Sequence, residues 1–201
     1  YNFLNNKYIQ CKDINDTDEF TLTLNAFNIM GFTEESIEHI FKIVASVLHL
    51  GNIQFDEEGS IIDNQPIEYI STLLHLKKDQ LINCLTYRKL KTVGEIIDIK
   101  MKQEECVKTR NSMAMKLYSN MFDYIVETIN KELKSDCKSF IGILDIFGFE
   151  SFETNSFEQF CINYTNETLQ EQFNEYMFKL EQNEYEAEEI DWQHITFPDN
   201  K

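Results

Sequence analysis

Residues 140–150 read FIGILDIFGFE, and this stretch decides the fold of the chain. It opens with a short apolar run after a polar turn, a pattern typical of a strand that is buried on both faces. Asp145 stands at the end of this run, Gly148 follows three residues later, and Glu150 is a second acid. The pattern predicts one buried strand at about 140–145, followed by a loop that carries two carboxylates.

The segment after this loop predicts a long helix. Ser156 and Gln159 have the spacing of a capping box, in which the side chains of the two residues bond each other's backbone N–H groups. The helix is expected to run for about 30 residues, to about Ala187, which is longer than most helices of globular proteins. Trp192 then falls in the loop beyond the helix.

A loop of this kind suits phosphate and a divalent cation. A carboxylate at a strand end, such as Asp145, can hold Mg²⁺ directly or through water. Gly148 lets a backbone N–H approach a phosphate with no Cβ in the way. Glu150 can pair with an Arg or orient a water molecule. The D-x-x-G-x-E pattern by itself leaves a second interpretation open, namely a strand-to-loop turn whose acids are merely solvated.

The residues before the loop predict a mostly helical body. Residues 87–101 alternate around Thr92-Val93-Gly94 and predict two strands joined by a loop. Residues 56–65 mix acids with Gly, Ser and Asn, which is typical of an exposed loop. Apolar spacing and helix-start signals predict further helices at about 16–31, 33–52, 66–75, 78–86 and 103–133.

Composition and charge argue against several classes of protein. The chain carries a formal net charge of −17, which is unsuited to nucleic acid and to anionic membrane surfaces. No apolar run has membrane-spanning length, so no direct membrane insertion is expected. The five Cys include no C-x-x-C pair, which argues against a zinc site or a redox motif. Free thiols favour a reducing, cytoplasmic setting.

Several motifs of the chain resemble those of myosins, and they occur in the same order. LDIFGFE at 144–150 is similar to the family's switch II. ETNSFEQFCINYTNE at 153–167 is similar to the start of its relay helix, and MFKLEQ at 177–182 continues that helix. LHLGNI at 48–53 is another family signature, and YNFLN at 1–5 resembles the segment that follows switch I. The matches span nearly the whole chain, which is therefore identified as part of a myosin motor head.

The resemblance implies a fold and a division of the chain. The expected class is a helix-dominated α+β fold, part of the P-loop NTPase-type myosin head. Residues 1–139 would belong to the upper 50 kDa-like helical subdomain, with an actin-facing loop at about 88–101. Residues 140–150 would supply a central-sheet strand and switch II, and residues 151–201 the relay helix and relay loop.

The resemblance also implies the roles of the loop residues. Asp145 matches the acid that reaches Mg²⁺ through water. Gly148 matches the residue whose amide senses the γ-phosphate of ATP, and Ile146 and Phe147 belong to the same nucleotide-binding loop. Glu150 matches the acid that pairs with an Arg of switch I and so closes the site around the attacking water. The implied reaction is phosphoryl transfer to water, in which positioning and charge stabilisation dominate.

Four residues are implied to couple this loop to the lever. They are Phe149, Asn155, Phe160 and Trp192. Trp192 is the only Trp of the chain and matches the tryptophan of the family's relay loop. A plain packing residue at the end of the helix is the other interpretation of this position.

Residues 88–101 resemble a loop that touches actin in the family. Counting back sixteen residues from Asn111, which aligns with the family's D-A-L-A-K segment, gives Glu95. Myosins have an acidic or phosphorylatable residue there, so Glu95 would supply a fixed negative charge without a kinase. An ordinary exposed Glu is the alternative. The acid-rich loop 56–65 occupies the place of another actin-facing loop. The expected actin interface comprises Lys91, Thr92, Val93, Gly94 and Glu95.

The chain also departs from the family pattern. NSMAM at 111–115 replaces the usual D-A-L-A-K, which removes an acid and a base from that helix. No GxxxxGK[ST] phosphate loop occurs in the 201 residues, and the Ser and Arg of switch I are not recognised. The isolated chain is therefore expected to bind ATP poorly and not to hydrolyse it.

The expected parent protein is an actin-activated Mg-ATPase motor. Its cofactors would be ATP and Mg²⁺, and its partners actin filaments together with calmodulin or light chains on a neck outside this chain. It would be cytoplasmic and cytoskeleton-associated. A myosin-like actin tether or scaffold with a decayed ATPase is the alternative. The intact Asp145, Gly148 and Glu150 favour the motor.

Overall fold

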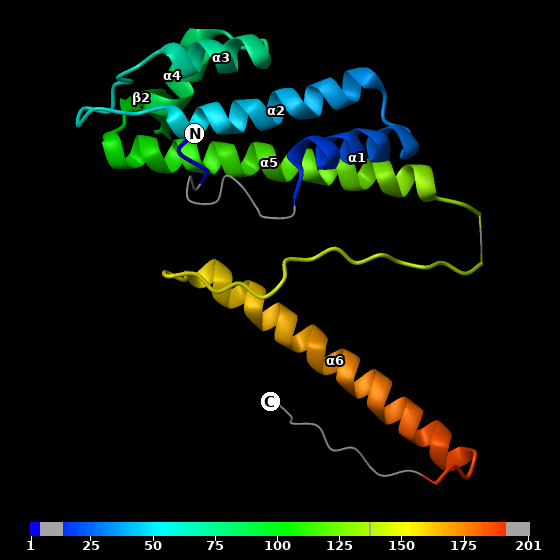
Figure 1. Cartoon of the computed structure of the whole chain (residues 1–201). Helices are drawn as coiled ribbons and strands as arrows, with labels where there is room; N and C mark the ends of the chain where they lie inside the picture. The colour runs from blue at the N-terminus through cyan, green and yellow to red at the C-terminus, as the bar shows by residue number, and fades with distance from the viewer. Residues whose placement is uncertain (5–13, 137, 192–201) are drawn as a thin grey trace. The chain divides into compact units, whose positions relative to one another are not determined.

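The computed structural model describes residues 1–4, 14–136 and 138–191. The chain divides into two compact units, 1–136 and 137–201. Its described part contains six helices and one two-stranded antiparallel sheet (Figure 1). This content confirms the predicted helix-dominated α+β class.

The predicted helices and the strand pair agree with the observed elements to within about two residues at each end. The second unit contains one helix, α6 (Phe157–Ala187). The strands of the first unit are β1 (Tyr87–Lys91) and β2 (Ile96–Lys100). The helices of the first unit are α1 (Asp16–Ile29), α2 (Glu34–Asn52), α3 (Gln65–Leu73), α4 (Lys78–Thr86) and α5 (Gln103–Leu133).

The centre of the first unit is the contact between α2 and α5, and α3 packs on α2 (Figure 1). α2 begins at the N-cap residue Thr33, whose Oγ1 accepts the Ser36 N–H at 3.2 Å. Removing a fully buried Leu or Ile side chain from such a core typically costs about 2–5 kcal/mol. The largest fully buried side chains are Leu50, Ile53, Ile67, Ile70, Leu85, Cys106 and Ser46.

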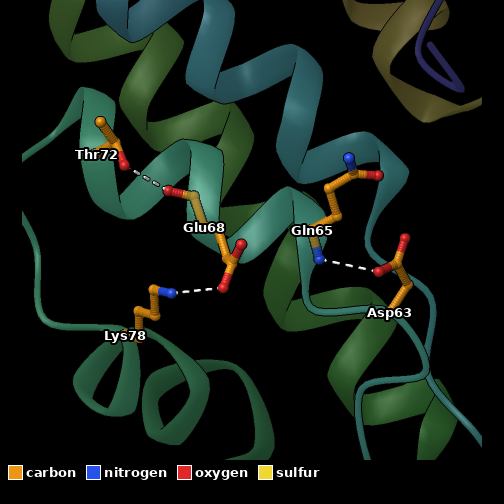
Figure 2. A network of polar contacts seen from close by, with 5 residues as sticks. All are labelled: Asp63, Gln65, Glu68, Thr72 and Lys78. Atoms are coloured by element: carbon orange, nitrogen blue, oxygen red, sulfur yellow. Dashed lines mark hydrogen bonds and ion pairs between the residues drawn. The ribbon is translucent and has the colours of Figure 1, made fainter.

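A small polar network links α3 to the residues around it (Figure 2). Asp63 Oδ1 accepts the Gln65 N–H at 2.9 Å and satisfies a free amide at the start of the helix. Lys78, the first residue of α4, forms an ion pair with Glu68. Thr72 Oγ1 donates to the Glu68 carbonyl oxygen at 2.9 Å. Both charged side chains are more than half exposed, so the ion pair contributes at most about 1 kcal/mol.

β1 and β2 form a hairpin that leads directly into α5. The two strands pair in antiparallel register from Tyr87 opposite Lys100 to Lys91 opposite Ile96. Lys100 Nζ donates to Ser60 Oγ at 3.0 Å, which fastens the loop after α2 to this hairpin. The hairpin confirms the predicted pair of strands at 87–101.

The predicted strand at 140–145 is wrong. Residues 140–150 have no regular secondary structure, and Phe140, Ile141 and Ile143 are each at least 90% exposed. A strand exists only beside a partner whose backbone groups complete its hydrogen bonds. The described residues of the second unit contain no such partner. The apolar run thus remains exposed, as is typical of a surface that another part of a protein covers.

The long helix after the loop is present where it was predicted. α6 follows the N-cap Ser156 and ends at Ala187, over 31 residues, and none of its described residues is buried. No helix in the described part of the chain is both long and apolar enough to cross a membrane.

Candidate functional site

The loop 145–150 and the first turns of α6 form the candidate site. The helix begins with a capping box, in which the Ser156 N–H donates to Gln159 Oε1 at 2.8 Å. The Ser156 hydroxyl also donates to the Glu158 carboxylate, and this bond holds the pKa of that carboxyl below its usual value. A negative charge in the first turn suits the positive end of the helix dipole. The capping residues therefore fix where α6 begins, directly after the loop segment.

Asn163 binds residue 150 through both ends of its side-chain amide. Asn163 Oδ1 accepts the Glu150 N–H at 2.8 Å, and Asn163 Nδ2 donates to the Glu150 carbonyl oxygen at 2.8 Å. Two hydrogen bonds to the same residue fix its backbone much as a paired strand would. The backbone position of Glu150 is therefore set by α6.

Two further amides on the helix complete the attachment. Asn166 Nδ2 donates to the Phe147 carbonyl oxygen at 2.8 Å, and Gln159 Nε2 donates to Glu150 Oε2 at 3.4 Å. Positions 159, 163 and 166 are spaced i, i+4 and i+7, so they share one face of the helix. α6 thus binds the loop at three places: the carbonyl oxygen of Phe147, the backbone N–H and carbonyl oxygen of Glu150, and the Glu150 carboxylate.

The two groups predicted to contact metal and phosphate, the Asp145 carboxylate and the Gly148 backbone, are both accessible in the structure. A Cβ added at Gly148 would meet no atom within 4 Å, and the Asp145 side chain is exposed. Within the described ranges, no three His, Cys, Asp or Glu side chains gather as a metal site. Mg²⁺ commonly takes only one or two protein carboxylates and completes its shell with water and substrate phosphates. The binding of Mg²⁺ by the single exposed carboxylate of Asp145 stays a prediction.

The predicted coupling residues have different surroundings. Asn155 Oδ1 accepts the Phe152 N–H at 3.0 Å, and Asn155 Nδ2 donates to the Phe152 carbonyl oxygen at 2.9 Å. This reciprocal pair shapes the turn before α6. Phe149 and Phe160 are each 65% exposed. Trp192 lies outside the described residues.

Phe160 belongs to a row of aromatic rings along α6. It stacks with Phe157 at a centroid distance of 6.2 Å and with Tyr164 at 6.4 Å. All three side chains are more than half exposed. An exposed apolar row of this kind is typical of a contact surface.

The predicted actin interface is brought together at the tip of the β1–β2 hairpin. The Thr92 N–H and Oγ1 both donate to the Glu95 carbonyl oxygen, at 2.9 and 3.2 Å. Gly94 has φ of +99°, a backbone conformation that favours glycine. Val93 and Glu95 are exposed, and Lys91 pairs with the first residue of β2. The five residues therefore form one accessible tip, and its partner remains a prediction.

Sequence reasoning missed the amides that attach the loop to the helix. Asn163 and Asn166 had no predicted role, and Gln159 was recognised only as a capping residue. Their i, i+4, i+7 spacing places three amide side chains on one face of the helix, but this spacing identifies a contact surface only once the position of the loop beside it is known.

Comparison with known proteins defines the class as a motor domain. A family model described as myosin head (motor domain) matches residues 1–201. Unconventional myosin-Vb of Homo sapiens is 45% identical over 196 residues, which cover 94% of this chain. Myosin-16 of Arabidopsis thaliana is 43% identical over 198 residues, with the same coverage of this chain. Myosin-8 of Arabidopsis thaliana is 43% identical over 213 aligned positions, which cover 100% of this chain. The chain belongs to the myosin head (motor domain) family.

The chain spans only a small part of these relatives. It covers 16% of myosin-16, 14% of myosin-8 and 11% of unconventional myosin-Vb. The similarity therefore establishes the family of this chain, and the activity and partners of the whole protein are proposed below.

Proposed function

We propose that this chain is the switch II and relay-helix part of an actin-activated myosin ATPase. The observation that carries the proposal is the double hydrogen bond between Asn163 and the backbone of Glu150. This contact joins the loop that carries Glu150 directly to α6. The helix has 31 residues and is about 46 Å long at 1.5 Å per residue. Loop 145–150 acts as switch II, and α6 acts as the relay helix.

The residues of the loop have separate roles in the proposed hydrolysis of ATP. A bound Mg²⁺ would neutralise charge on the phosphates. Asp145 would hold this cation through a water molecule, and Gly148 would donate its N–H to the γ-phosphate. Ile146 and Phe147 would supply adjoining backbone. Glu150 would pair with an Arg of switch I, and this pair closes the site around the attacking water.

Coupling follows from the attachment of the loop to α6. When Gly148 moves toward the phosphate, the carbonyl of Phe147 and the backbone of Glu150 must move with it. Asn166 and Asn163 are bonded to these groups at 2.8 Å and pull the start of the helix along. A rigid helix transmits such a displacement to its far end. Trp192 follows that end in the sequence, where its environment would report the state of the motor.

The motor is preferred over a tether with a decayed ATPase because Asp145, Gly148 and Glu150 are all present. The test measures Mg-ATPase turnover of the full parent head with and without actin filaments. The proposal predicts turnover that actin accelerates. A head that binds filaments without hydrolysing ATP would be the tether. The same parent would be cytoplasmic, associated with the cytoskeleton and supplied with calmodulin or light chains.

The isolated 201-residue chain should show no ATP turnover. It contains no G-x-x-x-x-G-K-[ST] sequence, whose backbone and Lys would cradle the phosphates. A phosphate-release assay on the purified chain, with the full parent head as positive control, checks this expectation. Turnover above background that depends on Mg²⁺ would contradict it.

Glu95→Ala in the full parent head should weaken activation by actin and keep the basal ATPase rate. The hairpin tip loses its fixed negative charge, and an exposed ion pair is worth up to about 1 kcal/mol, or roughly fivefold in affinity. The ATPase rate is measured against actin concentration at low and moderate salt. Glu127→Ala, an exposed acid of α5, serves as the control for net charge. An equal fall of the basal and activated rates would count against the role of this tip.

A further inference from the structure

Gln159 contacts both the start of α6 and the candidate acid. Its Oε1 accepts the Ser156 N–H at 2.8 Å and so takes part in the capping box. Its Nε2 donates to Glu150 Oε2 at 3.4 Å. The chain between these residues turns back through Asn155, whose side-chain amide bonds both backbone groups of Phe152. A single side-chain amide therefore connects the helix cap to the loop carboxylate.

The capping box decides which end of this amide faces Glu150. A Gln amide has an oxygen that only accepts hydrogen bonds and a nitrogen that only donates them. Because Oε1 is bound to the Ser156 N–H, Nε2 is the end that faces the carboxylate. Turning the amide over would set two donors against each other at the cap and two oxygen atoms against each other at Glu150. The orientation of the Gln159 amide is thus determined at both of its ends.

The Glu150 carboxylate has no cationic partner among the residues that the structure describes. The residue is half-buried, and within the described ranges Gln159 is the only donor to its side chain. The ion pairs found in the same ranges involve other acids. Gln159 binds Oε2, which leaves Oε1 to accept from a cation that approaches from another part of the protein.

A Glu at position 159 would serve the capping box as well as the Gln does. Both residue types are usual at the third position of a helix, and a Glu would also gain from the positive end of the helix dipole. However, a Glu would present an oxygen where Gln159 presents an N–H, and two carboxylates that share a site repel each other. The contact with Glu150 is therefore a physical reason for a neutral amide at this position.

We propose that Gln159 is a positioning residue for the hydrolysis step, which holds one oxygen of the Glu150 carboxylate so that the other meets the Arg of switch I. The inference rests on the proposed function, in which that pair closes the site around the attacking water. Gln159 acts through Glu150 and is not itself a catalytic residue. Its part differs from that of Asn163, which fixes the backbone of the acid, because Gln159 sets the direction in which the carboxylate points.

The test is Gln159→Glu in the full parent head, which exchanges the donor for an acceptor and keeps the cap. The Glu can still accept the Ser156 N–H, so the head should remain folded, as thermal unfolding checks. Rapid quench should show that the hydrolysis step slows at least about tenfold, because the acid loses a hydrogen bond and gains a repulsive neighbour. ATP binding should be unchanged. Gln170→Glu adds the same charge about three turns further along α6 and should hydrolyse ATP at the original rate.

A second comparison uses Glu150→Ala as the background. If Gln159 acts only through the Glu150 carboxylate, adding Gln159→Glu to Glu150→Ala should change the hydrolysis rate by less than about twofold, because both substitutions remove the same contact. Single turnovers followed over long times keep the slow rates of both heads measurable. A residue that merely supports the structure of α6 would lower the rate in this background too.

The outcomes separate this proposal from the proposed function. The original rate of hydrolysis in Gln159→Glu would overturn the positioning role. An equal loss in the presence and in the absence of the Glu150 carboxylate would also overturn it, since Gln159 would then act on the helix and not on the acid. Normal hydrolysis in Glu150→Ala alone would instead overturn the proposed function of the loop.

Discussion

Glu150→Ala in the full parent head leaves ATP binding largely intact and slows the hydrolysis step by orders of magnitude. The proposed pair between Glu150 and an Arg of switch I forms only when the site closes around the attacking water, so its loss acts on the transition state. Removing one such preorganised electrostatic contact typically costs about 10²–10³ in rate. Stopped-flow fluorescence with an ATP analogue measures binding, and rapid quench measures the hydrolysis step.

The chain offers a matched control for this prediction. Glu153 is another acid of the same segment, it is exposed, and it lies before the first turn of α6. Glu153→Ala removes the same charge from the same neighbourhood and should hydrolyse ATP at the original rate. Normal hydrolysis in Glu150→Ala would rule out the role assigned to this acid. A large loss of ATP affinity would place Glu150 in nucleotide binding instead.

Local signals in the sequence predicted the helices well. Thr33 was expected to start a helix and is the N-cap of α2, and the capping box of Ser156 and Gln159 is present at the start of α6. Each of these capping signals involves residues within one four-residue stretch, so it can be recognised without knowing how the rest of the chain folds. The alternation around Thr92-Val93-Gly94 likewise defines a hairpin, whose two strands pair only with each other in the described residues.

The failed strand depended on partners that are not local. The run that begins at Phe140 has the composition of a central strand, but a central strand needs neighbours on both sides. Within the described part of the second unit, no strand is available to provide them. Composition therefore identified a segment suited to a sheet, and the chain described here leaves it unpaired and exposed.

The attachment of the loop to α6 could be predicted only in part. The resemblance to myosins identified both the loop and the helix, but it did not say which side chains join them. That choice depends on how the turn around Asn155 folds back, because the turn sets which face of α6 meets the backbone of Glu150. Amide residues at 159 and 163 are common on solvated helix faces, so their spacing became meaningful only beside the loop.

Asn163→Leu in the full parent head should slow hydrolysis about 5- to 150-fold while the Glu150 carboxylate remains present. Leu has nearly the shape of Asn but makes neither hydrogen bond to the Glu150 backbone. Two neutral hydrogen bonds are together worth about 1–3 kcal/mol, which converts to this range of rates. Rapid-quench measurement of the hydrolysis step checks the effect, and thermal unfolding checks that the head remains folded.

Asn163→Asp separates the two bonds, because the carboxylate can still accept the Glu150 N–H but cannot donate to its carbonyl oxygen. Its hydrolysis rate should lie between those of the original head and Asn163→Leu. Asn174→Leu is the control, since Asn174 lies on the same helix and bonds Gln170 rather than the loop. If Asn163→Leu and Asn174→Leu slowed hydrolysis equally, the effect would come from α6 as a whole. A selective loss at Asn163 would instead show that the helix holds Glu150 by its backbone, which makes the position of this acid a property of α6.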